Sequence, residues 1–249
     1  LSDQAWAYIA GGAGDEVTLR RNRDAFDAIR LTSRVFAALD GGDTRVEILY
    51  LSSVTRDDRL ARFAMSVFDY DRRSDGIVAM NFPTRGTQES STYTMCWITM
   101  FRDYAYRGTN AAWLKSRLPG ARNAMEGLAL YENGDGLLEH LPGWSFVDWA
   151  PEYDNGVPGQ GVVNFQYLYT LKLLAETEEA LGETAYAKIW RAKAERLAAK
   201  LQETLWDEKR GMMADDAAGS RFSEHAQCLA ILSGMFPEDL CGRMFGGLT

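Results

Sequence analysis

The sequence is poor in cysteine and histidine and has no long run of apolar residues. Its 249 residues include three cysteines, at positions 96, 228 and 241, and two histidines. The cysteines lack the CxxC spacing of metal and redox sites, so free thiols in a reducing, cytoplasmic compartment are expected. No apolar run approaches the ~20 residues of a membrane helix, and the first residues lack the pattern of a signal peptide. The sequence therefore predicts neither a membrane protein nor a disulfide scaffold.

Positive charge is also scarce. The 27 lysines and arginines are outnumbered by 35 aspartates and glutamates, which gives a formal net charge of -8. Proteins that bind nucleic acids or anionic membranes carry clusters of basic residues, so neither is expected as a partner. The sequence contains no P-loop, nucleophile elbow or metal-ligand cluster, and no cofactor or metal is expected. A neutral, polyhydroxylated ligand suits this composition better.

Amphipathic helical patterns fill most of the chain, and no segment shows the convincing alternation of a β-strand. From residue 44 onward the predicted helices come in pairs, joined alternately by short turns and long loops. They cover residues 45–54, 57–68, 92–106, 111–131, 162–181, 184–206 and 222–236, with a short helix after Pro237. This alternation predicts an all-α, layered array of helical hairpins whose long loops gather on one face.

The longest connection, residues 132–161, is predicted to be a binding loop. Long loops in compact chains are usually functional or disordered, and the tryptophans here argue against disorder. An aromatic ring beside a carboxylate suits a pyranose, which offers C–H faces for stacking and hydroxyls for hydrogen bonds. Asp148 and Trp149 are therefore predicted to bind a sugar, although Trp149 could also belong to the core. Trp144 is a further candidate.

Other aromatic and histidine positions have structural interpretations. Trp97, Trp113, Trp190 and Trp206 fall within helical patterns and are predicted to lie in the core. His225 lies near a predicted helix start, where a structural hydrogen bond competes with a role in the site.

Residues 1–40 resemble the N-terminal helical unit of the FMN-dependent α-hydroxy acid oxidases. The resemblance rests on the run Tyr8-Ile-Ala-Gly-Gly-Ala-Gly-Asp-Glu16, followed by Thr18, Asn22 and Phe26. In that family the tyrosine at the position of Tyr8 binds the substrate carboxylate, whereas the flavin site lies in a following (β/α)₈ barrel. No strand-rich repeat follows here. The resemblance thus implies a small helical domain, residues 1–41, without flavin chemistry.

Residues 42–249 resemble the catalytic domain of α-L-rhamnosidases. The resemblance rests on Gly-Asp43-Thr-Arg, Asp75-Gly-Ile-Val, Trp144-Ser-Phe-Val-Asp148-Trp149 and Ser-Glu-His225-Ala, taken in this order and spacing. It implies an inverting glycoside hydrolase with an (α/α)₆ barrel that acts on terminal α-L-rhamnosyl residues. About eight helices are predicted where six hairpins need twelve, which implies an incomplete barrel and association through exposed helix faces. The two resemblances meet near Asp43, as in a fusion.

The second resemblance also implies an acid–base pair on which hydrolysis depends. Inverting hydrolysis needs a general acid and a general base on opposite faces of the sugar. In the family spacing, Asp43 belongs to the acidic cluster. The position of the acid is occupied here by Phe36 and that of another carboxylate by Leu31, and the position of the base lies beyond Thr249. Little hydrolysis is therefore expected, and Asp43 is predicted to bind substrate or only to cap a helix.

Two alternatives to hydrolysis remain open. One is a non-catalytic carbohydrate-binding or structural helical fragment. The other is a flavin oxidoreductase, which the first resemblance alone would suggest.

Overall fold

Eight α-helices and one very short antiparallel strand pair make up the part of the chain that the computed structural model describes, residues 44–82, 85–108, 110–147 and 161–247. The helices are α3 (Thr44–Thr55), α4 (Arg59–Asp71), α5 (Ser91–Arg107), α6 (Ala111–Ala129), α7 (Gly161–Ala180), α8 (Thr184–Leu205), α9 (Glu224–Ser233) and α10 (Glu238–Gly246). The predicted all-α class is confirmed. The predicted N-terminal unit, residues 1–41, lies outside the described residues, so the division into domains stays a prediction.

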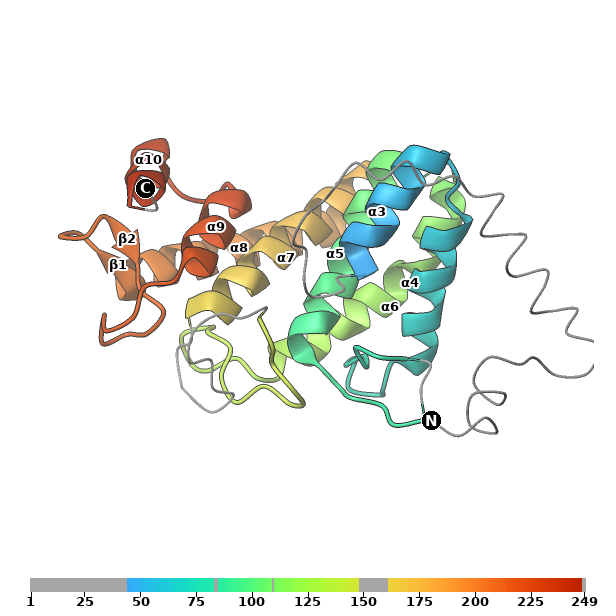
Figure 1. Ribbon diagram of the computed structural model, residues 1–249, viewed down its shortest axis with the longest axis horizontal. Coiled ribbons are helices and arrows are strands. Elements are labelled where there is room, and N and C mark those ends of the chain that lie inside the picture. The colour runs from blue at the N-terminus through green and yellow to red at the C-terminus, as the bar shows by residue number, and fades with distance from the viewer. Residues whose placement is uncertain (1–43, 83–84, 109, 148–160, 248–249) are drawn as a thin grey trace, which may run out of the picture. The chain divides into compact units, whose positions relative to one another are not determined.

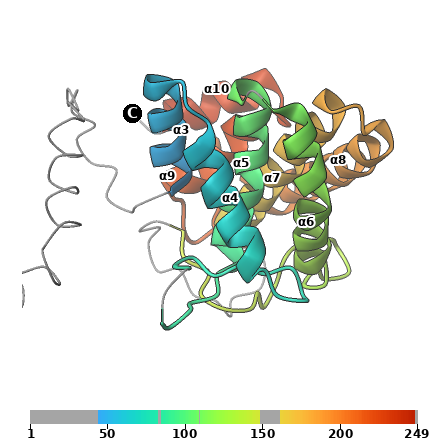
Figure 2. The ribbon, with the colours of Figure 1, turned by 90° about the vertical axis from the view of Figure 1, so that its right-hand side faces the viewer.

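The helices are arranged as four successive hairpins, α3–α4, α5–α6, α7–α8 and α9–α10, within the described residues. Helix α5 packs against α3 on one side and α7 on the other, and α7 packs in turn against α9, so these four helices form one layer. Each is followed by its hairpin partner, and Figure 2 shows α4 and α6 in front of that layer. This is the predicted array of paired helices.

Helix α7 forms the centre of the described array. It packs against α5, α8 and α9, and 14 of its 20 residues are buried, which explains why its sequence is apolar on nearly every side. Leu168, Leu171 and Leu174 have no exposed surface. Burying each such side chain contributes about 1.5–3 kcal/mol, so α7 holds its neighbours together mainly by the hydrophobic effect.

Local signals in the sequence fix several helix ends. The side chains of Ser90, Asn110 and Ser223 accept hydrogen bonds from backbone N–H groups in the first turns of α5, α6 and α9. Gly234 follows α9 in the left-handed conformation with φ +63°, where glycine is strongly favoured. Together Ser223 and Gly234 make α9 shorter than the predicted helix 222–236.

The prediction that Trp206 lies within a helix is wrong, although the residue packs against the core. Helix α8 ends at Leu205, and Trp206 begins strand β1 (Trp206–Asp207), which pairs antiparallel with β2 (Met212–Met213). Its ring is only partly buried, and its Nε1 donates to the exposed Glu208 carboxylate at 2.7 Å. Trp113 is also only partly buried. Trp97 and Trp190 lie in the core as predicted.

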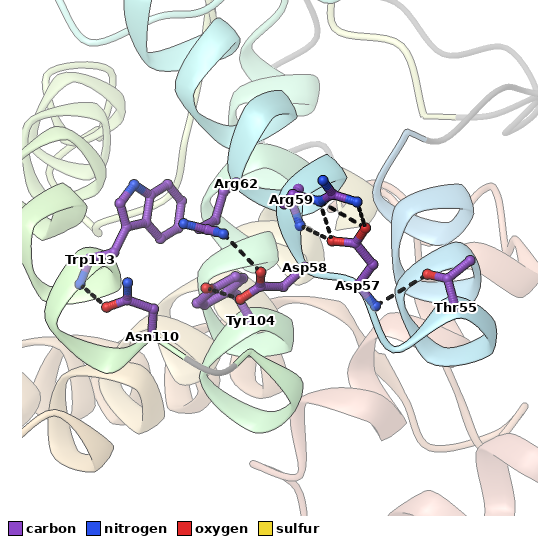
Figure 3. A network of polar contacts seen from close by, with 8 residues as sticks. All are labelled: Thr55, Asp57, Asp58, Arg59, Arg62, Tyr104, Asn110 and Trp113. Atoms are coloured by element: carbon purple, nitrogen blue, oxygen red, sulfur yellow. Dashed lines mark hydrogen bonds and ion pairs between the residues drawn. The ribbon is translucent and has the colours of Figure 1, made fainter.

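Polar contacts join the helices at the end where the short turns lie. The Asp58 carboxylate accepts a hydrogen bond from the Tyr104 hydroxyl at 2.6 Å and pairs with Arg62 at 3.1 Å, which links α4 to α5 (Figure 3). Burial raises the pKa of Tyr104 to about 12, and the bond to Asp58 adds to the shift. Beside it, the Asp57 carboxylate faces Arg59.

A second group of charges joins α6, α7 and α8. The Glu178 carboxylate has no exposed surface, and it receives hydrogen bonds from Arg122 at 2.8 and 2.6 Å. Arg122 also pairs with Glu183 at 3.0 Å, and its guanidinium lies 3.6 Å from the centre of the Tyr186 ring. The bonds to Glu178 raise the pKa of Arg122. These contacts explain how a charged residue is tolerated inside α7.

Within the described residues, no helix combines the length and the apolar character that crossing a membrane requires.

Candidate functional site

The long loops meet at the end of the array where α5, α7 and α9 begin. Ser91 of α5 donates a hydrogen bond to the Pro142 carbonyl, and the side-chain amide of Asn164 on α7 bonds both the N–H and the carbonyl of Leu138. Gly161, the first residue of α7, donates to the Asp215 carbonyl at 2.7 Å. In Figure 1 the loop segments formed by residues 72–82, 85–90 and 130–147 lie on the lower side of the helices. The predicted gathering of long loops on one face is therefore confirmed for the described residues.

Extended segments from two of these loops lie side by side. Ala79 bridges Glu89, and Ser90 bridges Gly143, in both cases antiparallel. The Trp144 N–H donates to the Glu89 carbonyl at 2.8 Å. Glu89 therefore lies between the other two segments, and its position depends on both loops.

Trp144, a candidate from the sequence, lies on this loop surface. Its side chain is 41% exposed, and its ring stacks on that of Phe146 with 4.6 Å between the ring centres. The segment that carries it is tied to α5 by hydrogen bonds from Ser91 and Thr92 to the carbonyls of Pro142 and Phe146. Trp144 is thus an exposed aromatic ring on a firmly attached backbone.

Charged groups border the segment that carries Trp144. Arg73 forms ion pairs with Glu89 and, at 2.9 Å, with Asp75, and all three side chains remain partly exposed. No sequence motif or spacing marks Arg73 or Glu89 as a site residue. Asp75 belongs to one of the resemblance motifs, and Glu89 directly precedes the N-cap Ser90, but neither signal shows that the two loops would bring these residues together.

His225 lies in the first turn of α9, where it is partly buried. The residue before this helix, Ser223, donates its hydroxyl to Asp215 at 2.7 Å and accepts the Ala226 N–H at 3.2 Å. Burial raises the pKa of Asp215, although the Ser223 hydroxyl opposes the shift. The arrangement orients the start of α9, and the role of His225 in a site stays a prediction.

The other predicted site residues, Tyr8, Asp43, Asp148 and Trp149, lie outside the described residues. Part of the predicted binding loop, residues 148–160, does so as well. Whether these residues meet Trp144 therefore stays a prediction.

The described residues contain no group of three or more histidine, cysteine, aspartate or glutamate side chains placed to hold a metal ion. Cys96, Cys228 and Cys241 are not joined in disulfides.

Comparison with known families decides the affiliation of the chain. Residues 41–244 match the bacterial alpha-L-rhamnosidase 6 hairpin glycosidase domain. The chain belongs to this family. The predicted resemblance is thereby confirmed, and four of the hairpins implied by the family's description are found in the described residues.

Solved structures of rhamnosidases share the fold of this family member. A rhamnosidase from Klebsiella oxytoca with rhamnose bound matches with a TM-score of 0.72 and 20% identity, over 83% of this chain and 40% of that chain. A GH78 family rhamnosidase of Bacillus sp. GL1 matches with a TM-score of 0.70 and 24% identity, over 83% of this chain and 22% of that one. The chain thus spans less than half the length of either protein. Among curated proteins, none matches this sequence.

A separate match covers the N-terminal region. Residues 1–51 match the FMN-dependent dehydrogenase family, in agreement with the first predicted resemblance. The described part of that match, residues 44–51, belongs to helix α3, which packs against α4 and α5 of the rhamnosidase-like array.

Proposed function

We propose that this chain is a glycoside hydrolase-like domain that recognises terminal α-L-rhamnosyl residues. The observation that carries the proposal is the family match over residues 41–244. The gathering of long loops at one end of the helices gives a surface on which such a ligand could be bound. A relative with rhamnose bound shares the fold, which supports rhamnose as the sugar to test first.

Asp43, Asp148 and Trp149 are the proposed sugar contacts. A carboxylate can accept hydrogen bonds from two neighbouring hydroxyls of a pyranose, and an indole ring can stack on its C–H face. Asp148 and Trp149 follow Trp144 closely in the same loop. Trp144 itself lies at the end of the array where the long loops meet. His225 at the start of α9 is a further candidate for this site.

Hydrolysis is proposed to be weak or absent. Inverting enzymes protonate the leaving oxygen with one carboxylic acid and activate water with a second carboxylate. In this sequence the position that the family resemblance assigns to the acid is occupied by Phe36, and an apolar side chain cannot transfer a proton. The chain is therefore expected to bind the sugar with little turnover.

Nitrophenol release from a nitrophenyl α-L-rhamnoside tests this proposal. Wild-type protein is expected to show little release above the uncatalysed rate. A substantial rate that Asp43→Asn abolishes would show that the acid–base machinery is intact. Calorimetric titration with rhamnose separates a binding domain from a purely structural fragment, because only the former produces heat of binding that saturates.

The N-terminal match calls for a separate test of flavin binding. The purified chain is expected to lack the visible absorption spectrum of a flavin. A stoichiometric flavin spectrum would instead favour an oxidoreductase.

Self-association is a further part of the proposal. Phe63 on α4 and Phe245 on α10 are well exposed, and apolar helix faces of this kind favour contacts between chains. Sedimentation velocity at several concentrations tests it, with a concentration-dependent dimer expected and a monomer at all concentrations opposing it.

A further inference from the structure

Trp144 differs from the other exposed aromatic residues of the described chain in how its backbone is held. Tyr70 and Tyr106 extend from helix surfaces, whereas Trp144 lies in an irregular segment at the loop end. This segment is fixed to its neighbours by the Trp144 N–H bond to Glu89 and by the bonds from Ser91 and Thr92. An exposed ring with a fixed backbone loses little conformational entropy when it binds a ligand.

Gly143 explains why this attachment is so close. Its φ is +69°, and a Cβ atom at this position would lie 2.5 Å from the Glu89 carbonyl oxygen. Only glycine fits such a conformation and such a short distance. The backbone of residues 143–144 therefore packs directly on that of Glu89, which fixes the position of Trp144.

The antiparallel bridge also determines which residue lies opposite Trp144. Because Ser90 is opposite Gly143, Glu89 is opposite Trp144. The Trp144 N–H donates to the Glu89 carbonyl at 2.8 Å, so the two backbones are in direct contact. Glu89 in turn pairs with Arg73, whose side chain is 47% exposed. The exposed indole ring thus extends from a backbone that directly contacts Glu89, and the Glu89 carboxylate and its partner Arg73 both reach solvent.

We propose that Trp144, Glu89 and Arg73 form a platform for the sugar ring that carries the terminal rhamnosyl residue. The inference rests on the proposed function and names the part of the substrate that this surface would contact. A pyranose could stack its C–H face on Trp144 while its hydroxyls bond Glu89 and Arg73. Phe146 stacks on Trp144 and supports the ring. An open platform suits a part of the substrate that stays partly in solvent.

Calorimetric titration of the full chain with rhamnose and with a rhamnosyl-glucose disaccharide tests the platform. The wild type is expected to bind the disaccharide more tightly than rhamnose. Trp144→Ala should weaken disaccharide binding by about five- to tenfold, the size of one aromatic stacking contact, and should leave rhamnose binding unchanged. Glu89→Gln should weaken disaccharide binding to a smaller extent.

Tyr106→Ala is the matched control, because this ring is 75% exposed but lies at the far end of α5. It should change neither affinity. Circular dichroism and urea unfolding establish whether each variant is folded. If Trp144→Ala does not fold, Glu89→Gln provides the test.

The outcomes distinguish the platform from the proposed function. Absence of rhamnose binding by the wild type overturns the proposed function and the platform with it. If rhamnose binds, the platform alone is overturned by any of three results: equal affinities for the two sugars, no effect of Trp144→Ala, or equal loss of both ligands in that variant. Selective loss of the disaccharide supports it.

Discussion

The two ends of the helical array differ in what their polar groups do. At the end with the short turns, side chains pair with each other across helices, as Asp58 does with Tyr104 and Arg62. At the end with the long loops, backbone and short hydroxyl side chains hold the chain in place, whereas the rings and charges of Trp144, Glu89 and Arg73 remain partly exposed.

This difference separates stability from recognition. Side chains whose donors and acceptors are already paired, and which are shielded from solvent, have few free groups with which to bind a ligand. They instead join helices that are distant in sequence. Side chains that are exposed on a fixed backbone can bind a ligand without reorganising the fold. Substitutions of the paired, shielded side chains should therefore change stability, and substitutions of the exposed side chains at the loop end should change binding.

The largest effect is expected from Glu178→Ala at the buried contact between α6 and α7. Removing one partner of a buried ion pair leaves the other without its counter-charge, which costs about 3–5 kcal/mol. Arg122 keeps its contact with Glu183, so a value near the lower limit is expected. Urea unfolding measures the change. Glu179→Ala, at a neighbouring exposed ion pair with Arg191, is the control and should cost less than about 1 kcal/mol. Equal effects would contradict the contrast between buried and exposed pairs.

Gly143→Ala should damage the loop end next. An alanine would need a left-handed conformation and would place its Cβ against Glu89, so a loss of about 2 kcal/mol is expected. Sugar binding should fall as well, since the platform shifts, while far-UV circular dichroism stays helical. A Cβ atom at Gly86 would lie in open space, and this residue has no positive φ, so Gly86→Ala is the matched control. A Gly143→Ala variant with wild-type affinity for the disaccharide would weaken the assignment of this end to recognition.

Tyr104→Phe should have a smaller effect, at the short-turn end. It removes the hydroxyl that donates to Asp58, and hydrogen bonds to charged groups contribute about 1.5 kcal/mol or somewhat more. The effect also depends on pH. The pKa of Tyr104 is raised from 10.0 to about 12 in the folded state, so above pH 10 the unfolded chain releases this proton first. Stability should therefore fall between about pH 10 and 12, and the part of the fall due to Tyr104 should be absent in the variant.

Unfolding midpoints of the wild type and Tyr104→Phe across this pH range check the prediction. Parallel curves would show that Tyr104 does not titrate differently in the two states.

The smallest effect is expected from Asp215→Asn. The asparagine side chain can still accept a hydrogen bond from the Ser223 hydroxyl. The substitution removes a carboxyl group whose pKa is raised by burial. A raised pKa means that the folded state holds its proton longer than the unfolded state, so ionising Asp215 lowers stability as pH rises above the ordinary value of 3.8. The variant should thus be as stable as the wild type at neutral pH or more stable, by less than about 1 kcal/mol. Marked destabilisation at pH 7 would contradict this.

The helical hairpins could be predicted from the sequence because their signals are local. Apolar periodicity marks the helices, and residues such as Ser90, Asn110 and Gly234 mark their ends within a few positions. The alternation of short and long connections also predicts on which side the loops lie. The failure at Trp206 has a tertiary cause, because the strand pair it joins depends on Gln227 of α9, whose side chain bonds the Met213 backbone.

Trp144 could be singled out from the sequence because an aromatic ring in a long loop is a recognisable signal. Arg73 and Glu89 could not, since they lie in a different loop and ordinary charged residues of that kind are usually only solvated. Nothing in the spacing of Glu89 and Trp144 shows that Gly143 allows their backbones to touch.

The sequence by itself determined the all-helical class, the pairing of the helices and the affiliation with the rhamnosidase family, because each depends on patterns within short segments or on ordered motifs. The tertiary structure alone decided which side chains meet across the loops and which charges are buried in pairs. Such contacts depend on distances between residues remote in the chain, as with Glu89 and Trp144 at one end and Arg122 and Glu178 towards the other. A one-dimensional pattern does not contain those distances.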